Sequence, residues 1–518
     1  MKSFLLPLLA MLLGGCASLP DNSDREESHA LSGPRDSLIS RDYYQAPESE
    51  EGKSAFLLLG NGLDAFVARA VLAQQATTGI DLQYYMIHGD HVGELLVGQL
   101  LKAADRGVRV RILLDDIDEG RRDFDIAVFD MHPNIEVRIF NPFGRNVARG
   151  WQYVTGFGRQ TRRAHNKSFT VDNIATILGG RNIGDEYFER DPELAFQDLD
   201  VLAVGPVAER VSKSFDDYWN FELSYPIASL LDEPPTQADY ERLRKVFEQE
   251  LERLESSPYI ERLQDSDLAR GLRAGSVKYE WAVGHVYADP PEKLLKSTGD
   301  DQQERMIDGL LPYLEGAKEE LIIASPYFVP GKDGVAFLRK LRERGVRVRI
   351  LTNSLASTDV AIVHAGYARY RKALLRAGVE LWELDETISK EDRKAIKEGH
   401  LGESKSSLHA KAFVVDRKTV FIGSLNLDPR SVIQNTEIGV VFESPAIGRH
   451  IAEDFDADID KDAFRLELVE DKEDGRSWIV WHGYRNGRPV TWDTEPNTGF
   501  WRRFGVGFLR LMPIESQI

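Results

Sequence analysis

The sequence predicts an α/β protein of two similar domains in tandem, each with a mixed β-sheet flanked by helices. Its 518 residues, 42% of them hydrophobic, are too many for one ordinary core. The stretch RGVRVRILLDD, which begins at Arg106, recurs as RGVRVRILTN from Arg344, each time after an amphipathic helical pattern. Helix, glycine-containing turn and strand, twice over, are typical of a duplicated α/β unit.

The first residues of the chain have the pattern of an export signal. A lysine precedes an apolar run over residues 4–13, which at about ten residues is too short to span a bilayer. We therefore expect residues 1–15 to be a signal peptide. Its end, LGGC, resembles the lipobox of bacterial lipoproteins, in which the cysteine, here Cys16, is lipidated. The alternative is an ordinary secretory signal.

Cys16 carries three expectations. As the single cysteine of the chain, it cannot form an intrachain disulfide. Lipidation there would make the protein a membrane-anchored lipoprotein on the periplasmic side. By the sorting rule of such lipoproteins, Ala17 after the cysteine, in place of aspartate, indicates the outer membrane.

The composition also predicts the domain boundaries. Residues 16–53 are polar and acidic, so we expect the lipidated cysteine and a flexible tether there. The first domain is predicted over residues 54–235. Residues 236–300 are predicted to form a helical linker with a strand that leads into the second domain. That domain is expected to span residues 301–518 and to end in an amphipathic segment.

One motif accompanies the duplication. His-x-Lys-x4-Asp occurs twice, 244 residues apart, as His165, Lys167 and Asp172 and as His409, Lys411 and Asp416. Ten residues after each aspartate, a Gly-x-x-Asn segment ends in Asn182 and Asn426. Two such matches in register with a duplicated fold are very unlikely to arise by accident.

The spacing within the motif suits phosphodiester chemistry. Histidine and lysine two residues apart on a strand share one face, about 7 Å from each other. They offer a nucleophile or proton donor beside a fixed positive charge. Along an extended strand, each motif aspartate lies roughly 23 Å from its histidine. We therefore expect Asp172 and Asp416 to brace the turn that follows the strand. Asn182 and Asn426, on the neighbouring strand, can donate to a phosphate oxygen.

The paired motif resembles the phospholipase D superfamily. The resemblance implies that the two domains face each other across a pseudo-twofold axis and share one active site. It implies that His165 attacks the phosphorus and His409 protonates the leaving alkoxide, although the two roles can be exchanged. Because Lys167 and Lys411 supply positive charge, we expect no metal and no cofactor.

The superfamily also keeps an acidic residue after the Gly-x-x-Asn segment, which orients a histidine through its other ring nitrogen. Asp198 and Glu437 match this position, and Asp200 is an alternative to Asp198. The second half has Ser424 where the first has Gly180. We therefore expect Ser424 to contact the phosphate and the first half to lack a hydroxyl contact.

One further stretch has metal-binding residue types. MIHGDHVGE contains His88, Asp90, His91 and Glu94. Because it lies between a predicted strand and a predicted helix, we expect a helix-capping turn instead.

Charge and aromatic residues limit the classes of substrate that we expect. The formal net charge of −19 disfavours nucleic acid, which needs a clustered basic surface. Residues 144–163 mix arginines with Trp151, Tyr153 and Phe157, which suits a lipid headgroup region or, alternatively, an irregular loop. The C-terminal segment suits a helix in a membrane interface or, alternatively, a core helix. At helical spacing it carries Phe500, Phe504, Phe508 and Leu511, and among them lie Arg502, Arg503 and Arg510.

The sequence around the second motif, GSLNLDPRSVIQNTEIGVV, and the closing PIESQI resemble the bacterial cardiolipin synthase C family. The resemblance implies a phosphatidyltransferase that passes a phosphatidyl group from one phospholipid, expected to be phosphatidylethanolamine, to phosphatidylglycerol. The alternative is hydrolysis of phospholipid at the same site, and an exported nuclease is disfavoured by charge and anchor. Phospholipids are the expected partners, and the oligomeric state stays open.

Overall fold

The computed structural model describes residues 19–510, apart from 118–121, 146–148, 150–159, 191–193, 296–304, 387–404, 472 and 486. Cys16, Ala17, Trp151, Tyr153, Phe157 and Leu511, for which the sequence makes predictions, lie outside the described residues. Within the described ranges, no helix is both long enough and apolar enough to cross a membrane.

The first half of the chain forms a nine-stranded mixed sheet in the order β10-β1-β8-β6-β5-β2-β3-β4-β9. In it β2, β3 and β4 run parallel, whereas β5, β6 and β8 pair antiparallel. Its strands are β1 (Ser54–Leu59), β2 (Gly79–Tyr84), β3 (Arg109–Asp115), β4 (Ile135–Phe140), β5 (Ser168–Val171), β6 (Ala175–Gly179), β8 (Asp200–Val204), β9 (Ser224–Pro226) and β10 (Glu280–Ala282). The helices up to the linker are α2 (Arg41–Gln45), α3 (Pro47–Glu50), α4 (Gly62–Gln75), α5 (His91–Asp105), α6 (Asp123–Asp130), η1 (Asp185–Tyr187), α8 (Pro206–Trp219) and η2 (Ile227–Leu230).

The second half forms a ten-stranded sheet in the order β11-β18-β17-β16-β12-β13-β14-β19-β20-β21. Its strands are β11 (Gly284–Ala288), β12 (Glu320–Ala324), β13 (Arg347–Asn353), β14 (Glu380–Leu384), β16 (Ala412–Val415), β17 (Thr419–Gly423), β18 (Ile438–Glu443), β19 (Ala463–Glu470), β20 (Ser477–Arg485) and β21 (Arg488–Trp492). Its helices are η3 (Pro291–Leu294), α12 (Met306–Glu315), α13 (Gly331–Glu343), α14 (Ala361–Ala368), α15 (Arg371–Arg376), η4, a π-helix (Arg430–Gln434), α17 (Pro445–Asp462) and α18 (Phe500–Leu509). The order β18-β17-β16-β12-β13-β14 repeats β8-β6-β5-β2-β3-β4, which confirms the predicted pair of mixed sheets.

The repeated helix, turn and strand follow from the local sequence. α5 begins where the Asp90 side chain accepts a hydrogen bond from the Gly93 amide, a helix N-cap. Gly107 and Gly345 then reverse the chain into β3 and β13 with φ of 95° and 88°, a left-handed conformation that favours glycine. Both halves thus contain the predicted glycine turn at the same place.

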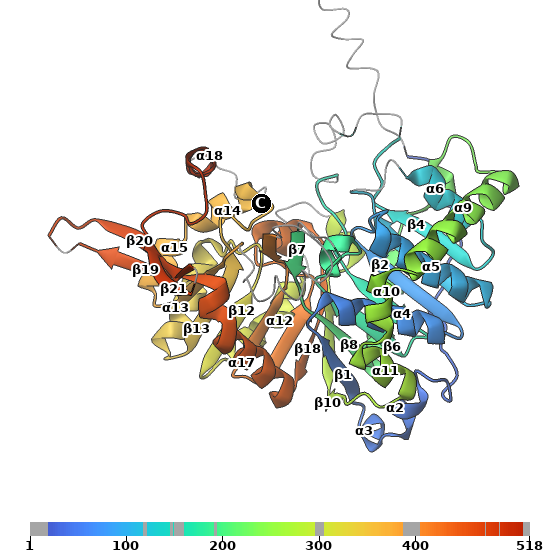
Figure 1. Ribbon diagram of the computed structural model, residues 1–518, viewed down its shortest axis with the longest axis horizontal. Helices are drawn as coiled ribbons and strands as arrows, with labels where there is room; N and C mark the ends of the chain where they lie inside the picture. Colours follow the sequence, from blue (N-terminus) through green and yellow to red (C-terminus); the bar gives the residue numbers. More distant parts are fainter. Residues whose placement is uncertain are drawn as a thin grey trace, which may run out of the picture.

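The two sheets pack against each other through an apolar core (Figure 1). β6 and β8 contact β17 and β18, and the rings of Phe56 and Phe442 stack with centroids 4.1 Å apart. The core also contains these buried residues of the two halves: Leu178, Val201, Ala203, Val414, Val420, Ile422 and Val440. A small parallel sheet of β7 (Leu194–Gln197) and β15 (Lys405–Leu408) also joins the halves. Because burial of apolar surface drives this contact, the halves form one body around the site.

The described part of the expected tether differs from the prediction. Residues 19–53 lie against the first half, where Arg111 donates to the Ser28 carbonyl at 2.9 Å and Arg138 to the Glu26 carbonyl at 2.6 Å. The Asn22 side chain donates to the Ser224 carbonyl at 2.8 Å. Buried guanidinium groups need acceptors, and this polar segment provides them. The polar composition of this segment predicts a flexible tether, but hydrogen bonds to the first half hold its described residues in place.

The linker is divided between the two halves. Its helices α9 (Gln237–Glu255), α10 (Pro258–Gln264) and α11 (Asp267–Ala274) contact α4, α5 and α6 of the first half. β10 then extends the first sheet, and β11 directly after it opens the second. The chain thus crosses between the halves at residue 283.

Candidate active site

Each His-Lys pair lies at the start of the hairpin that its motif opens. His165 and Lys167 directly precede β5, and His409 and Lys411 directly precede β16. All four side chains are buried. The ammonium groups of Lys167 and Lys411 donate to the backbone carbonyls of His165 and His409, at 2.7 and 2.5 Å. Each lysine is therefore held beside its own histidine, although both residues lie just before the strand on which the spacing places them.

Backbone hydrogen bonds join each histidine to the opposite half. The His165 amide donates to the Thr436 carbonyl at 2.9 Å, and the His409 amide donates to the Gln197 carbonyl at 2.8 Å. Thr436 and Gln197 each directly precede one of the two predicted carboxylates. Neither half therefore builds a histidine site by itself.

The carboxylates cross the interface in the same way. Nδ1 of His165 lies 2.9 Å from Oε2 of Glu437, and Nδ1 of His409 lies 2.6 Å from Oδ2 of Asp198. Each histidine is thus oriented through Nδ1. Nε2 of His165 is turned to the chemistry, whereas Nε2 of His409 also lies 3.3 Å from Nζ of Lys411. Asp200, the alternative to Asp198, instead binds Arg69 at 2.8 Å. The sequence predicted which acids orient the histidines, but not that each acid comes from the other half.

The charges around the histidines identify a single site. Burial and the ammonium groups of Lys167 and Lys411 lower the pKa of His165 well below its usual value. Burial and Lys411 also lower the pKa of His409, against the opposing effect of Asp198. Since Lys411 acts on His165 and Lys167 acts on His409, the two motifs share one cluster of charges. Burial lowers the pKa of both lysines as well.

The two carboxylates differ in charge. Burial raises the pKa of the Glu437 carboxyl to about 8, against the opposing effects of Lys167 and the Ser424 hydroxyl. Burial also acts to raise the pKa of Asp198, but His409 and Lys411 outweigh it and hold that pKa below its usual value. Asp198 is therefore ionised at neutral pH, whereas Glu437 is largely protonated.

Ser424 has a different place from the one predicted. Its hydroxyl donates to Oε2 of Glu437 at 2.5 Å and accepts from the Ile438 amide at 3.0 Å. It therefore positions the carboxyl group, and the expectation of a phosphate contact is corrected. Gly180, its counterpart, lies directly against Asp198, where any Cβ would overlap Oδ1. The first half lacks a hydroxyl there because the shorter acid leaves no room for one.

The two asparagines are buried. Asn182 Nδ2 donates to the Tyr187 hydroxyl at 3.0 Å. Within the described residues, Oδ1 of Asn182 and Oδ1 of Asn426 have no hydrogen-bond partner. Both amides thus keep an acceptor that a donor of a ligand can use, whereas a contact to a phosphate oxygen has to come from Nδ2.

The motif aspartates have a structural role, but in a different contact from the one predicted. The Asp172 carboxylate accepts hydrogen bonds from the amides of residues 77–79, and the Asp416 carboxylate from those of residues 318–320. These segments lead into β2 and β12. Because β5 and β16 run antiparallel to those strands, the end of each motif meets the start of its neighbour. Each aspartate therefore braces the preceding strand rather than only the following turn.

Aromatic side chains that the sequence reasoning missed enclose the histidines. The Tyr85 ring lies 5.0 Å from the His165 ring, and the Tyr187 and Phe196 rings each lie 5.2 Å from the His409 ring. Tyr187 and Phe196 come from the first half and contact the histidine of the second. The signal for Tyr85 is its place at the end of β2, beside the motif strand, whereas the other two contacts depend on how the halves meet.

The predicted capping turn is present. Asp90 caps α5 and also accepts from the Asp185 amide at 2.7 Å, and His91 Nδ1 lies 2.8 Å from the Asp185 carboxylate. His88, Asp90 and Glu186 offer ligand atoms within 4.8 Å of one another. The Asp90 contacts fit a structural turn, because its carboxylate is occupied by backbone amides.

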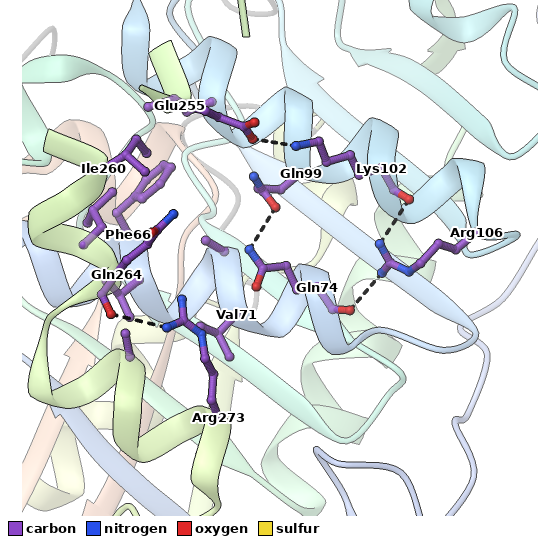
Figure 2. Close-up of a pocket in the computed structure, with 15 residues that line it drawn as sticks. Phe66, Val71, Gln74, Gln99, Lys102, Arg106, Glu255, Ile260, Gln264 and Arg273 are labelled. Atoms are coloured by element: carbon purple, nitrogen blue, oxygen red, sulfur yellow. Dashed lines mark hydrogen bonds and ion pairs between the residues drawn. The ribbon is translucent and has the colours of Figure 1, made fainter. Parts of the chain in front are cut away.

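A separate pocket lies on the outer side of the first half (Figure 2). Its volume is about 540 Å³, and helices α4, α5, α10 and α11 line it with an apolar floor that includes Phe66 and Ile260. Lys102 pairs with Glu255 at its rim, and Arg106 donates to the Gln74 carbonyl. None of the predicted catalytic residues lines this pocket.

Comparisons with known proteins agree with the duplicated architecture. The family model described as "Cardiolipin synthase, PLD-like domain" matches residues 71–219 and again residues 310–459. Cardiolipin synthase C of Escherichia coli (strain K12) is 42% identical over 473 residues, which cover 90% of this chain and 96% of that protein. An uncharacterized protein of Helicobacter pylori is 32% identical over 530 residues and covers 99% of both chains. The crystal structure of a phosphatidylserine synthase from Haemophilus influenzae Rd KW20 has the same fold, with a TM-score of 0.52, 14% identity and coverage of 82% of this chain and 91% of that one.

Proposed function

The chain belongs to the family of cardiolipin synthases with phospholipase D-like domains, and on this basis we propose that it transfers a phosphatidyl group to phosphatidylglycerol and so makes cardiolipin. It is a cardiolipin synthase-like enzyme of the phospholipase D superfamily. The donor is another phospholipid, with phosphatidylethanolamine as first candidate. The observation that carries the proposal is the pair of buried histidines, each held at Nδ1 by an acid of the opposite half.

In the first step, Nε2 of His165 attacks the donor phosphorus. The bond from phosphorus to the headgroup oxygen breaks, and His409 gives its proton to that oxygen, so the headgroup alcohol leaves. The low pKa of His165 favours a free electron pair on Nε2. The pKa of His409 is lowered too, but ionised Asp198 opposes that shift, whereas no acid of the described residues is among the main influences on the pKa of His165. This difference favours His165 as nucleophile and His409 as acid.

In the second step, the acceptor takes the phosphatidyl group. His409, now neutral, removes the proton from a glycerol hydroxyl of phosphatidylglycerol while the bond from phosphorus to Nε2 of His165 breaks. Lys167 and Lys411 stabilise the negative charge on the non-bridging oxygens, and Asn182 and Asn426 donate to them. The products are cardiolipin and the free enzyme.

Hydrolysis is the second candidate, because water can take the place of the acceptor alcohol. The aromatic rings of Tyr85, Tyr187 and Phe196 support transfer, since apolar walls reduce access of water to a phosphohistidine.

One incubation separates the candidates. Purified protein is given phosphatidylglycerol with and without phosphatidylethanolamine, and the lipids are analysed, with the His165→Ala variant as control. Cardiolipin that forms with release of ethanolamine supports the proposal. Phosphatidic acid as the single product contradicts transfer, and cleavage of DNA without any lipid product contradicts both lipid functions.

We propose further that Cys16 is lipidated and that Ala17 directs the protein to the outer membrane, facing the periplasm. The support is the LGGC sequence after a short apolar run. Metabolic labelling with a fatty acid, followed by separation of the two membranes, tests this. Label that remains in the Cys16→Ala variant contradicts the site, and protein in the inner-membrane fraction contradicts the sorting.

A further inference from the structure

The most exposed large apolar side chains of the described residues all lie on one short helix. α18 carries Phe500, Trp501, Phe504 and Phe508, which are 63%, 79%, 60% and 60% exposed. The rings of the first three lie 5.3 to 6.2 Å from one another, and Phe508 follows Phe504 by one helical turn. These four residues, here named the aromatic patch, cover the outward face of the helix. Such a patch on a folded surface marks a binding surface.

The opposite side of α18 fixes the orientation of the patch. Val506 is buried against Leu355 and Ala365 of the second half. Arg369 donates to the Leu509 carbonyl at 3.3 Å, at the end of the helix. The helix is therefore anchored by its back, and its aromatic side points outward because the other side packs on the protein.

Charge distinguishes this segment from the rest of the chain. Residues 499–510 contain three arginines and no acidic residue, whereas the whole chain has a net charge of −19. Arg502 and Arg510 are exposed on the same segment as the aromatic patch. Aromatic and arginine side chains together suit the boundary between acyl chains and anionic headgroups. A helix of ten residues, about 15 Å long, can lie in that plane but is too short to cross a bilayer.

α18 is also joined to the catalytic site. Arg502 donates to the Thr358 carbonyl at 3.0 Å. Thr358 belongs to the loop after β13. At the end of that strand, the Asn353 side chain donates to and accepts from the backbone of Leu408, the neighbour of His409. Figure 1 shows α18 at the upper left, above α14, whereas β7 lies lower, between the two halves. α18 is therefore connected, through the β13 loop, to the segment that carries His409.

We propose that α18 docks on an anionic phospholipid surface, with the aromatic patch among the acyl chains and the arginines at the phosphates. The docked helix holds the second half, and with it the shared site, at the lipid surface. A second copy of this chain is the competing occupant, but two such helices would bring their arginines together. The choice of a lipid surface rests on the proposed function, whereas the test below needs no turnover.

The test uses the full-length protein and vesicles of phosphatidylethanolamine and phosphatidylglycerol whose acyl chains carry bromine, which quenches tryptophan on contact. The emission of Trp501 is taken as the difference between the protein and its Trp501→Phe variant. Trp478, 41% exposed on β20, is the matched control, measured through Trp478→Phe. We expect the bromine to quench Trp501 by about half or more and to leave Trp478 unchanged. An unquenched Trp501 overturns the proposal, and so does equal quenching of both tryptophans.

A triple variant tests the consequence for catalysis. Phe500→Ser, Phe504→Ser and Phe508→Ser together are expected to lower transfer in vesicles by roughly tenfold or more. Transfer between dispersed short-chain phospholipids should stay unchanged, because the patch lies outside the chemistry. An equal loss on both substrates overturns the proposal, as does a dimer of the unchanged protein that the triple variant abolishes. If neither substrate reacts with the unchanged protein, the proposed function fails, while the quenching result still decides on docking.

Discussion

The two halves of the shared site carry the same motif but hold their histidines in different electrostatic states. His409 lies 2.6 Å from an acid, Asp198, whose pKa is below its usual value. His165 lies 2.9 Å from Glu437, whose pKa is about 8. In the first contact the acid is ionised, and in the second it is largely protonated. A duplicated motif can therefore serve two different chemical steps, because the acid that tunes each histidine is supplied by the other half.

The largest effects should come from the histidines themselves. We expect His165→Ala and His409→Ala each to lower phosphatidyl transfer by about 10⁴-fold or more. The measurement is cardiolipin formation at saturating lipid. A rate within tenfold of the unchanged protein for either variant would refute the shared site.

A substrate with a good leaving group distinguishes the two histidines. Phosphatidyl-p-nitrophenol needs no acid to expel its headgroup, so p-nitrophenol release should recover in His409→Ala and stay absent in His165→Ala. Recovery in His165→Ala alone would exchange the two roles. The two variants are matched controls for each other, because both remove a buried imidazole.

The acids should differ in the same direction. Asp198→Asn removes the negative charge that stabilises a proton on His409, so we expect a loss of about 100-fold in the transfer rate. Glu437→Gln replaces a largely neutral carboxyl by a neutral amide of the same shape, so the loss at pH 7 should be about tenfold or less. Steady-state transfer rates of the two variants, measured side by side, check this. A larger loss in Glu437→Gln would overturn the electrostatic difference between the halves.

The pKa of Glu437 also makes stability depend on pH. Its value of about 8 lies above the ordinary 4.5, so the folded protein holds a proton that the unfolded chain has released between these values. This stabilisation is complete below the ordinary pKa and is lost as the pH rises toward 8. Glu437→Gln has no such proton, so the melting temperature of the unchanged protein should fall relative to this variant between about pH 5 and pH 8.

Asp198→Asn is the control for the pH dependence. The pKa of Asp198 is below its usual value, so its contribution to stability is present throughout that pH range and is lost only in stronger acid. The difference in melting temperature between Asp198→Asn and the unchanged protein should therefore stay constant above about pH 7, where neither Asp198 nor His409, whose pKa Asp198 also influences, changes its charge. A slope in this control, or a flat profile for Glu437→Gln, would contradict the assigned pKa directions.

The duplicated fold and the chemical groups of the site can be predicted from sequence, because both depend on local patterns. The His-x-Lys spacing places two side chains on one face, and the second copy of RGVRVRI indicates the second sheet. The crossing of Asp198 and Glu437 depends on how two separate sheets meet. No repeating sequence pattern within either half indicates how the two sheets contact each other.

Other differences have the same origin. The expected tether is ordered because Arg111 and Arg138 donate to it from within the first half, and its composition contains no sign of those donors. Ser424 looked like a phosphate ligand because its partner, Glu437, is 13 residues away in the chain and 2.5 Å away in space. The hydrogen-bond partner of a polar group is often distant in the chain, so the residues next to it in sequence do not indicate which partner it has.

The smallest effects should come from the residues beneath the two acids. Gly180→Ser adds a Cβ that overlaps Oδ1 of Asp198, so we expect it to displace the acid from His409 and lower transfer by about tenfold. Ser424→Ala removes one hydrogen bond to a largely neutral Glu437, so the loss should be about two- to fivefold. The two rates, compared at equal folded concentration, measure how strictly each histidine must be held. A larger loss of transfer rate in Ser424→Ala than in Gly180→Ser would contradict this order. It would mean that His165, the nucleophile, tolerates less displacement than His409, the acid.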